Sequence, residues 1–174
     1  MRKFTVVITI LTITLLVLSS CGAASINREE IVQILESGFT AELQISYRDL
    51  EIAATLTSPK VGGESIEIHS PPSLAGLIAN FSAGTPTITH QGLTAELTNT
   101  DIPLTSALTA IINTLNAARS NEISISQTQN LITAKGRGLS GNFTLTFTED
   151  LTLKSIEIRQ INLIANVTNL THTN

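Results

Sequence analysis

The chain has 174 residues and a formal net charge of −4 at pH 7, from 10 Lys and Arg residues against 14 Asp and Glu residues. Because nucleic-acid binding requires clustered basic side chains, this acidic balance argues against a nucleic-acid-binding protein. Only 14% of the residues are charged and 3% are aromatic. A charged share well below the usual value of roughly 25% indicates long uncharged segments.

The N-terminal segment has the pattern of a secretory signal. Arg2 and Lys3 precede an uncharged, mostly apolar run over residues 4–18. A basic start followed by an apolar run of this length is typical of a signal peptide. The run is shorter than the roughly 20 apolar residues that a spanning helix needs. We therefore expect residues 1–20 to be removed from the mature protein.

Cys21 is the single cysteine of the chain and ends the motif Leu18-Ser19-Ser20-Cys21. This motif resembles the lipobox of bacterial lipoproteins, in which a Leu and two small residues precede a Cys. The resemblance implies that the thiol of Cys21 receives a diacylglyceryl group and that cleavage occurs just before it. The new amino group is then open to acylation with a fatty acid such as palmitate. The alternative is an ordinary signal peptide with an unrelated Cys near its cleavage site.

Lipidation of Cys21 would determine both the chemistry and the location of the mature chain. Two or three acyl chains give a stable membrane anchor, whereas one chain binds reversibly. No thiol would remain for catalysis or for a disulfide. The mature chain keeps eight basic and 14 acidic residues, a formal net charge of −6. In a Gram-positive cell the resemblance implies the outer face of the cytoplasmic membrane. In a two-membrane cell it implies the outer membrane, facing the periplasm, because Gly22 and not the Asp of the usual inner-membrane retention signal follows Cys21.

We expect a short tether over residues 21–26 and a single domain over residues 27–170. Asn27 as a cap, Glu30 three residues later and Gly38 as a terminator predict the first helix. Strict alternation of apolar and polar residues over residues 39–48 then predicts a half-buried strand. Further strands are expected at residues 52–56, 66–68, 74–81, 87–90 and 93–97, with a turn at residues 59–63.

The second predicted helix carries no charge. Apolar residues from Leu104 to Ala118 recur with helical spacing, and Asp101 is its candidate cap. No Asp, Glu, Lys or Arg occurs from Ile102 to Ala118, although a solvated helix face normally carries some charge. Strands are then expected at residues 122–126, 131–135, 142–148, 153–159 and 161–167, followed by a frayed tail over residues 171–174.

This order of elements predicts an α+β fold that is mainly antiparallel β. Short strands between turn residues favour a meander that is curved into a sandwich or an open barrel. The layout resembles the half-barrel of LolA-like and LppX/LprG-like lipoproteins. The resemblance implies a monomer with a curved sheet of about ten strands and two main helices on its concave side. It rests on FTAELQISYRDLEIAATL (residues 39–56), SPPSLAGLIANF (70–81), TITHQGLTAEL (87–97) and Ile102-Pro103-Leu104.

The same resemblance implies a lipid or other apolar ligand between the concave sheet and the two helices. Two charge-free stretches, residues 68–95 and 102–118, agree with the apolar lining of such a cavity. A close-packed core produces the same pattern. In that case the protein is a non-catalytic scaffold or protein-interaction module of the cell envelope. The residues that we expect to line a cavity are Ile31, Leu35, Leu43, Ile45, Leu77, Leu108, Ile111, Ile112 and Leu115.

No motif in the sequence indicates catalysis or a cofactor. His69, His90 and His172 lack the spacing of metal ligands. Glu149 and Asp150 fall in an expected turn, and no G-x-S-x-G elbow occurs. The glycines around Lys135 lack the spacing of a phosphate-binding loop. We therefore expect no enzymatic activity, no metal and no cofactor.

Replacing Cys21 by Ala tests the anchor. The full-length Cys21→Ala variant keeps the secretory segment but offers no thiol for lipidation. We expect loss of fatty-acid labelling, loss of cleavage before residue 21, and release or mislocalisation, measured by metabolic labelling and membrane fractionation. Ser25→Ala, which lies outside the motif, is the control and should be processed like the unaltered chain. Full membrane retention of Cys21→Ala with an uncleaved N-terminus would show that the apolar run is itself the anchor.

Overall fold

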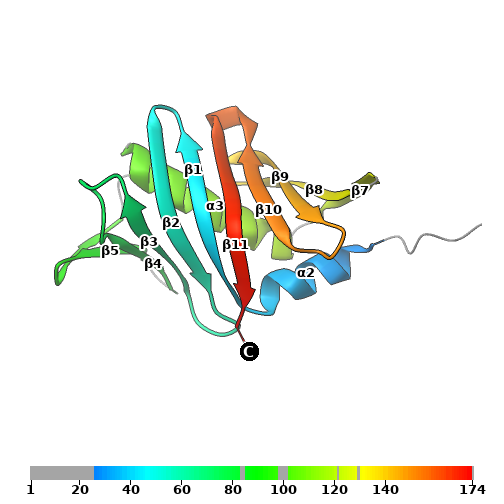
Figure 1. Cartoon of the computed structure of the whole chain (residues 1–174), viewed down its shortest axis with the longest axis horizontal. Coiled ribbons are helices and arrows are strands. Elements are labelled where there is room, and N and C mark those ends of the chain that lie inside the picture. Colours follow the sequence, from blue (N-terminus) through cyan, green and yellow to red (C-terminus); the bar gives the residue numbers. More distant parts are fainter. Residues whose placement is uncertain (1–25, 83–84, 98–101, 121, 129, 174) are drawn as a thin grey trace, which may run out of the picture.

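The computed structural model describes residues 26–82, 85–97, 102–120, 122–128 and 130–173. Within them lie two α-helices, α2 (Arg28–Glu36) and α3 (Pro103–Ser120), and one short 3-10 helix, η1 (Arg159–Ile161) (Figure 1). The secretory segment, Cys21 and the candidate cap Asp101 lie outside the described residues. Neither described helix is long and apolar enough to cross a membrane.

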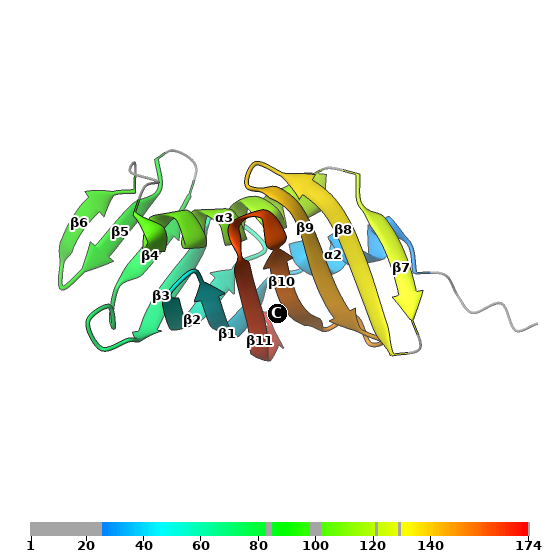
Figure 2. The same cartoon turned by 90° about the horizontal axis from the view of Figure 1, so that it is seen from above.

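The strands form one antiparallel sheet of eleven strands in the order β6-β5-β4-β3-β2-β1-β11-β10-β9-β8-β7. Strands β1 and β11, from opposite ends of the domain, therefore pair at its centre, and β6 and β7 are its edges (Figure 2). The bounds are β1 Phe39–Tyr47, β2 Leu50–Ser58, β3 Glu64–Ser70, β4 Ile78–Phe81, β5 Thr87–His90, β6 Leu93–Glu96, β7 Ser124–Thr128, β8 Leu131–Gly138, β9 Gly141–Thr148, β10 Leu153–Ile158 and β11 Leu163–His172.

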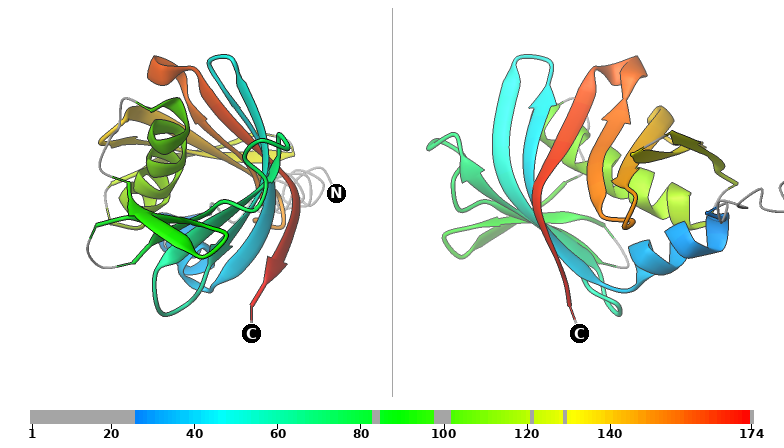
Figure 3. Two further views of the ribbon diagram at one scale, coloured as in Figure 1. Left: turned by 90° about the vertical axis from the view of Figure 1, so that its left-hand side faces the viewer. Right: turned by 45° about the vertical axis from the view of Figure 1, so that its right-hand side comes forward.

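The sheet is open and curved, and α3 lies along its concave side (Figure 3). The predicted α+β half-barrel with two helices is confirmed, with eleven strands where about ten were expected. The alternation that predicted β1 arises because successive side chains point to opposite faces of the sheet and only the concave face is covered. Phe39, Leu43 and Ile45 face the inside and are buried, whereas Glu42 and Gln44 face solvent. The same period of two places Phe143, Leu145 and Phe147 of β9 inside.

The first helix begins and ends where the sequence predicts. The Asn27 side chain accepts a hydrogen bond from the Glu30 backbone N–H at 3.0 Å, which is the expected N-cap. Gly38 has a φ of +83° after the helix, a conformation that side-chain-bearing residues rarely adopt. Ile31 and Leu35 form the buried face of α2.

The C-terminal tail prediction was wrong. Strand β11 continues to His172, which lies opposite Phe39, and Thr171 lies opposite Thr40. The Thr173 backbone N–H also donates to the Gly38 carbonyl at 3.1 Å. Every residue of β1 has a partner in β11, and the register skips Thr168 at a shift between Glu42 and Leu43. Residues 171–172 therefore belong to the central strand pair and not to a frayed end.

The strand predicted over residues 74–81 is shorter in the structure. Strand β4 begins only at Ile78, and residues 71–76 form a turn after β3. Gly76 occupies the left-handed region with a φ of +82°, and its N–H donates to the Ile68 carbonyl at 2.8 Å. The two prolines and the glycine favour a compact turn over an extended strand. Leu77 consequently follows this turn and lies at the start of β4.

Candidate functional site

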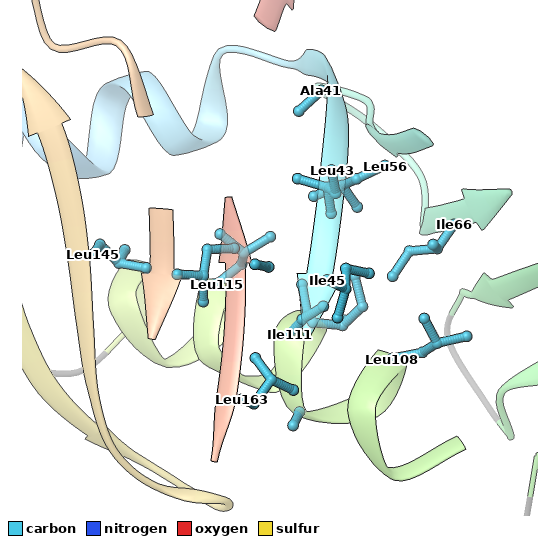
Figure 4. Close-up of a cluster of buried hydrophobic side chains, with 14 of the residues drawn as sticks. Ala41, Leu43, Ile45, Leu56, Ile66, Leu108, Ile111, Leu115, Leu145 and Leu163 are labelled. Atoms are coloured by element: carbon cyan, nitrogen blue, oxygen red, sulfur yellow. The ribbon is translucent and has the colours of Figure 1, made fainter. Parts of the chain in front are cut away.

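The predicted cavity residues come together in the structure. Ile31 and Leu35 of α2, Leu43 and Ile45 of β1, and four side chains of α3 all belong to one hydrophobic cluster. Figure 4 shows Ile45 of β1 beside Ile111 of α3, with Leu108 and Leu115 on neighbouring turns of the helix. Leu77 is only half-buried and packs against the edge of this cluster. These side chains therefore lie where the sheet packs against the two helices.

This meeting point is filled with side chains. The eight cluster residues from α2, β1 and α3 are at most 3% exposed. Four of the depressions on the surface of the described residues are lined by none of the nine predicted residues. In this conformation α3 occupies the space where an apolar ligand would lie.

Helix α3 is buried on most of its surface and has only a narrow, partly exposed face. Eleven of its 18 residues are buried. Two of them, Thr105 and Thr114, are polar but uncharged. Its partly exposed face carries Thr109, Asn113 and Asn116 and no charged side chain before Arg119. The apolar surface of the helix therefore packs against the inside of the half-barrel. Its outer face is polar but, before Arg119, uncharged.

The C-terminal end of α3 is fastened to its surroundings through Arg119. Nε and Nη2 of Arg119 donate to the Leu35 carbonyl at the end of α2, at 3.2 and 3.0 Å. Nη2 also donates to Ser58 Oγ of β2 at 2.7 Å, and Nη1 donates to the carboxylate of Glu64 in β3. The Arg119 and Glu64 side chains are only 16% and 12% exposed, so water screens this ion pair weakly.

These contacts join α2, β2 and β3 to the last turn of α3. We name the cluster of Leu35, Ser58, Glu64 and Arg119 the Arg119 clamp. Arg28 of α2 adds a hydrogen bond from Nη2 to the Arg119 carbonyl at 3.1 Å. A cation at this position also interacts favourably with the negative end of the helix dipole.

The opposite end of α3 has a different kind of contact with the sheet. Leu104, Ala107 and Leu108 pack into the core there. The Tyr47 hydroxyl at the end of β1 lies 3.1 Å from Ser106 Oγ, and either oxygen can donate. Apolar packing and one neutral hydrogen bond thus hold the first turns, whereas a partly buried ion pair holds the last turn.

No sequence motif marks the Arg119 clamp. The signal in the sequence is that Arg119 is the one basic residue in the last turn of an otherwise uncharged helix. Its acidic partner, Glu64, lies 55 residues earlier in the chain. Their proximity follows from the curvature of the sheet, which the sequence pattern does not specify.

The histidines do not converge on a metal site. His69 Nε2 lies 2.7 Å from Thr55 Oγ1, and His172 Nδ1 lies 3.3 Å from Ser37 Oγ. Both contacts are exposed and join neighbouring elements of the surface. Across the part of the chain that the structure describes, no group of three or more His, Cys, Asp or Glu side chains could hold a metal ion.

No protein-family model matches the sequence, and no curated protein matches it. The fold is similar to that of an uncharacterized conserved protein from Thermus thermophilus, with a TM-score of 0.51, 12% sequence identity, and coverage of 84% of this chain and 86% of that chain. This likeness shows a shared fold.

Two further solved structures are similar to lesser degrees. A LolA superfamily protein from Nitrosomonas europaea has a TM-score of 0.42 at 6% identity, with 86% of this chain and 95% of that chain covered. A chain of the complex between the CwlD amidase and the GerS lipoprotein from Clostridioides difficile has a TM-score of 0.44 at 12% identity, with 86% and 95% covered.

Removing the guanidinium of Arg119 tests the clamp. Arg119→Ala removes the donor that the Glu64 carboxylate and the Leu35 carbonyl share. Glu64 is only 12% exposed, so water replaces this donor poorly. We expect the free energy of unfolding to fall by about 2–3 kcal/mol, measured by urea denaturation.

Arg159→Ala is the matched control. Its ion pair with Glu157 joins Nε and Oε1 at 2.8 Å, but the Arg159 side chain is 83% exposed. Exposed pairs contribute about 0–1 kcal/mol, so this variant should remain close to the unaltered protein. Equal, small losses in both variants would show that the Arg119 clamp does not stabilise the position of α3.

Proposed function

We propose that the protein is a membrane-anchored extracytoplasmic protein that binds a lipid or another apolar ligand between the concave face of its sheet and α3. The observation that carries the proposal is the attachment of α3. An uncharged, apolar helix fills the half-barrel, and its last turn is held by an ion pair while its first turns are held mainly by apolar side chains.

An apolar ligand can replace these apolar contacts. Lifting the first turns of α3 exposes side chains such as Leu104 and Leu108, which costs roughly 25 cal/mol for each Å² of apolar surface. An acyl chain that enters beneath the helix buries that surface again together with its own. The Arg119 clamp meanwhile keeps the last turn in place. In this proposal α3 is a cover that turns about its C-terminal end.

The proposed lipid anchor at Cys21 would hold the domain close to the membrane. If Cys21 is lipidated, only residues 22–27 separate it from α2, and a chain of that length reaches roughly 20 Å when extended. The domain would then lie next to the membrane surface. Membrane lipids are an abundant source of acyl chains, which supports a lipid as the ligand class.

A second candidate function is a non-catalytic interaction module of the cell envelope. It is favoured by the tight burial of the predicted lining residues, eight of which are at most 3% exposed. In this case α3 is a permanent part of the core and the outer surfaces bind a partner. Neither candidate assigns an enzymatic reaction to the protein.

Native mass spectrometry of the full chain purified from membranes distinguishes the two candidates. We expect a mass above that of the acylated polypeptide, with the excess removed by organic solvent, together with saturable binding of the apolar dye N-phenyl-1-naphthylamine. A mass equal to polypeptide plus anchor, without dye binding, would contradict ligand binding and support the interaction module.

Tyr47→Phe extends this test to the movement of α3. The variant removes the hydrogen bond between Tyr47 and Ser106 and so weakens the attachment of the first turns of α3 to β1 by about 1 kcal/mol. If the dye enters only when these turns lift, its association should accelerate by about fivefold. Thr89→Val is the matched control, because it removes the 3.1 Å contact between Thr89 Oγ1 and Thr94 Oγ1 in the distant β5–β6 hairpin. Acceleration in both variants alike would contradict a specific role of α3.

A further inference from the structure

The outer face of the sheet has a groove of its own. A depression of about 690 Å³ crosses β7, β8, β9 and β10. Its lining includes Thr133, Lys135 and Thr144, which alternate with the buried Ala134 and Leu145 along their strands. Because successive side chains of a strand point to opposite faces, this groove lies on the side away from α3. It is therefore independent of the ligand site proposed above.

A second depression of about 440 Å³ continues the first. Both are lined by Glu157 and Arg159, and the second extends to Ser46, Arg48 and Ile164. We name the two together the outer groove. Since the depressions share two residues, the outer groove runs across the strands from β7 to β1 and does not end at β10.

The strand register explains how the outer groove crosses these strands. One cross-strand row of outward positions contains Ser124, Lys135, Thr144, Glu157, Ile164 and Ser46. Neighbouring strands lie roughly 4.8 Å apart, so five steps span about 24 Å. A second row beside it contains Ser126, Thr133, Thr146, Ser155, Asn166 and Gln44. Seven of the twelve residues in the two rows are Ser or Thr, and Thr133 and Thr146 of the second row also line the groove.

The outer groove carries a net positive charge, whereas the whole chain is net negative. Lys135, Arg159 and Arg48 line it together with one acid, Glu157. Arg159 donates from Nε to Glu157 at 2.8 Å, and Arg48 lies over the Tyr47 ring with its Cζ 5.1 Å from the centroid. Three of the eight basic residues after residue 20 thus line one groove of a chain whose sequence after residue 20 has a formal net charge of −6.

We propose that the outer groove binds an acidic polysaccharide. Ser, Thr, Asn and Gln side chains both donate and accept hydrogen bonds, which suits a ligand rich in hydroxyl and amide groups. The three cations that line the groove, Lys135, Arg159 and Arg48, suit a carboxylate on some of its sugars. The length of the groove suits a linear polymer, because a small ligand is normally enclosed over most of its surface.

Binding of soluble glycan strands tests the proposal. The probe is the unbranched polymer of alternating N-acetylglucosamine and N-acetylmuramic acid, which carries a carboxylate on every second sugar. We expect the full chain, held in nanodiscs of uncharged lipid, to bind it saturably in isothermal titration calorimetry. Binding should weaken as salt is raised, and chitin oligosaccharide, which lacks the carboxylates, should bind more weakly.

Two double variants separate a specific site from general charge. Lys135→Ala with Arg159→Ala should weaken binding about tenfold or more. Lys60→Ala with Lys154→Ala removes the same charge from exposed positions outside the outer groove, and should leave the affinity within about twofold. Thr144→Val, at the centre of the row, should also weaken binding without any change of charge.

Three results would overturn the proposal. The first is no saturable binding by the unaltered chain. The second is an equal loss in both double variants with no effect of Thr144→Val, which would indicate general charge attraction. The third is binding of the chain to vesicles of anionic lipid through Lys135 and Arg159 without binding to the glycan, which would identify a membrane-contacting surface instead.

Discussion

The packing of α3 into the concave side of the sheet is the constraint on which the rest of the structure depends. An open, curved sheet leaves one apolar face that must be covered, and α3 covers it with eleven buried residues. The helix can be this apolar because the sheet surrounds it on several sides. The curvature in turn brings Glu64 and Ser58 within reach of Arg119, so the polar clamp exists only because the apolar packing does.

The sequence predicted those parts of the architecture that follow from the spacing of apolar residues and from residues that begin or end an element. Strict alternation over residues 39–48 located β1, and Asn27 and Gly38 bounded α2. The end of β11 was missed because its polar sequence beyond Val167 carries no alternation, and only pairing with β1 makes it a strand. The lining of a cavity could be predicted only as a set of apolar residues. A closed core and an open cavity use the same residues, and packing distinguishes them.

The two faces of the sheet have separate roles in this account. A period of two assigns Leu145 to the core and Thr144 to the outer groove, although they are neighbours in the chain. The inner face is apolar and covered by a helix, whereas the outer face is rich in hydroxyl groups and carries Lys135, Arg159 and Arg48. The two proposals use this division, since the apolar ligand is proposed for the inner side and the polar polymer for the outer face.

Amide hydrogen exchange along α3 tests the central claim most directly. If α3 is a cover that turns about the Arg119 clamp, amides in the first turns should exchange faster than those in the last turn, and an apolar ligand should change the exchange of the first turns most. The exchange of the central strands β1 and β11 should stay slow throughout. Uniform protection along α3, equal to that of β1 and unaffected by fatty acid, would contradict the account and identify α3 as a fixed part of the core.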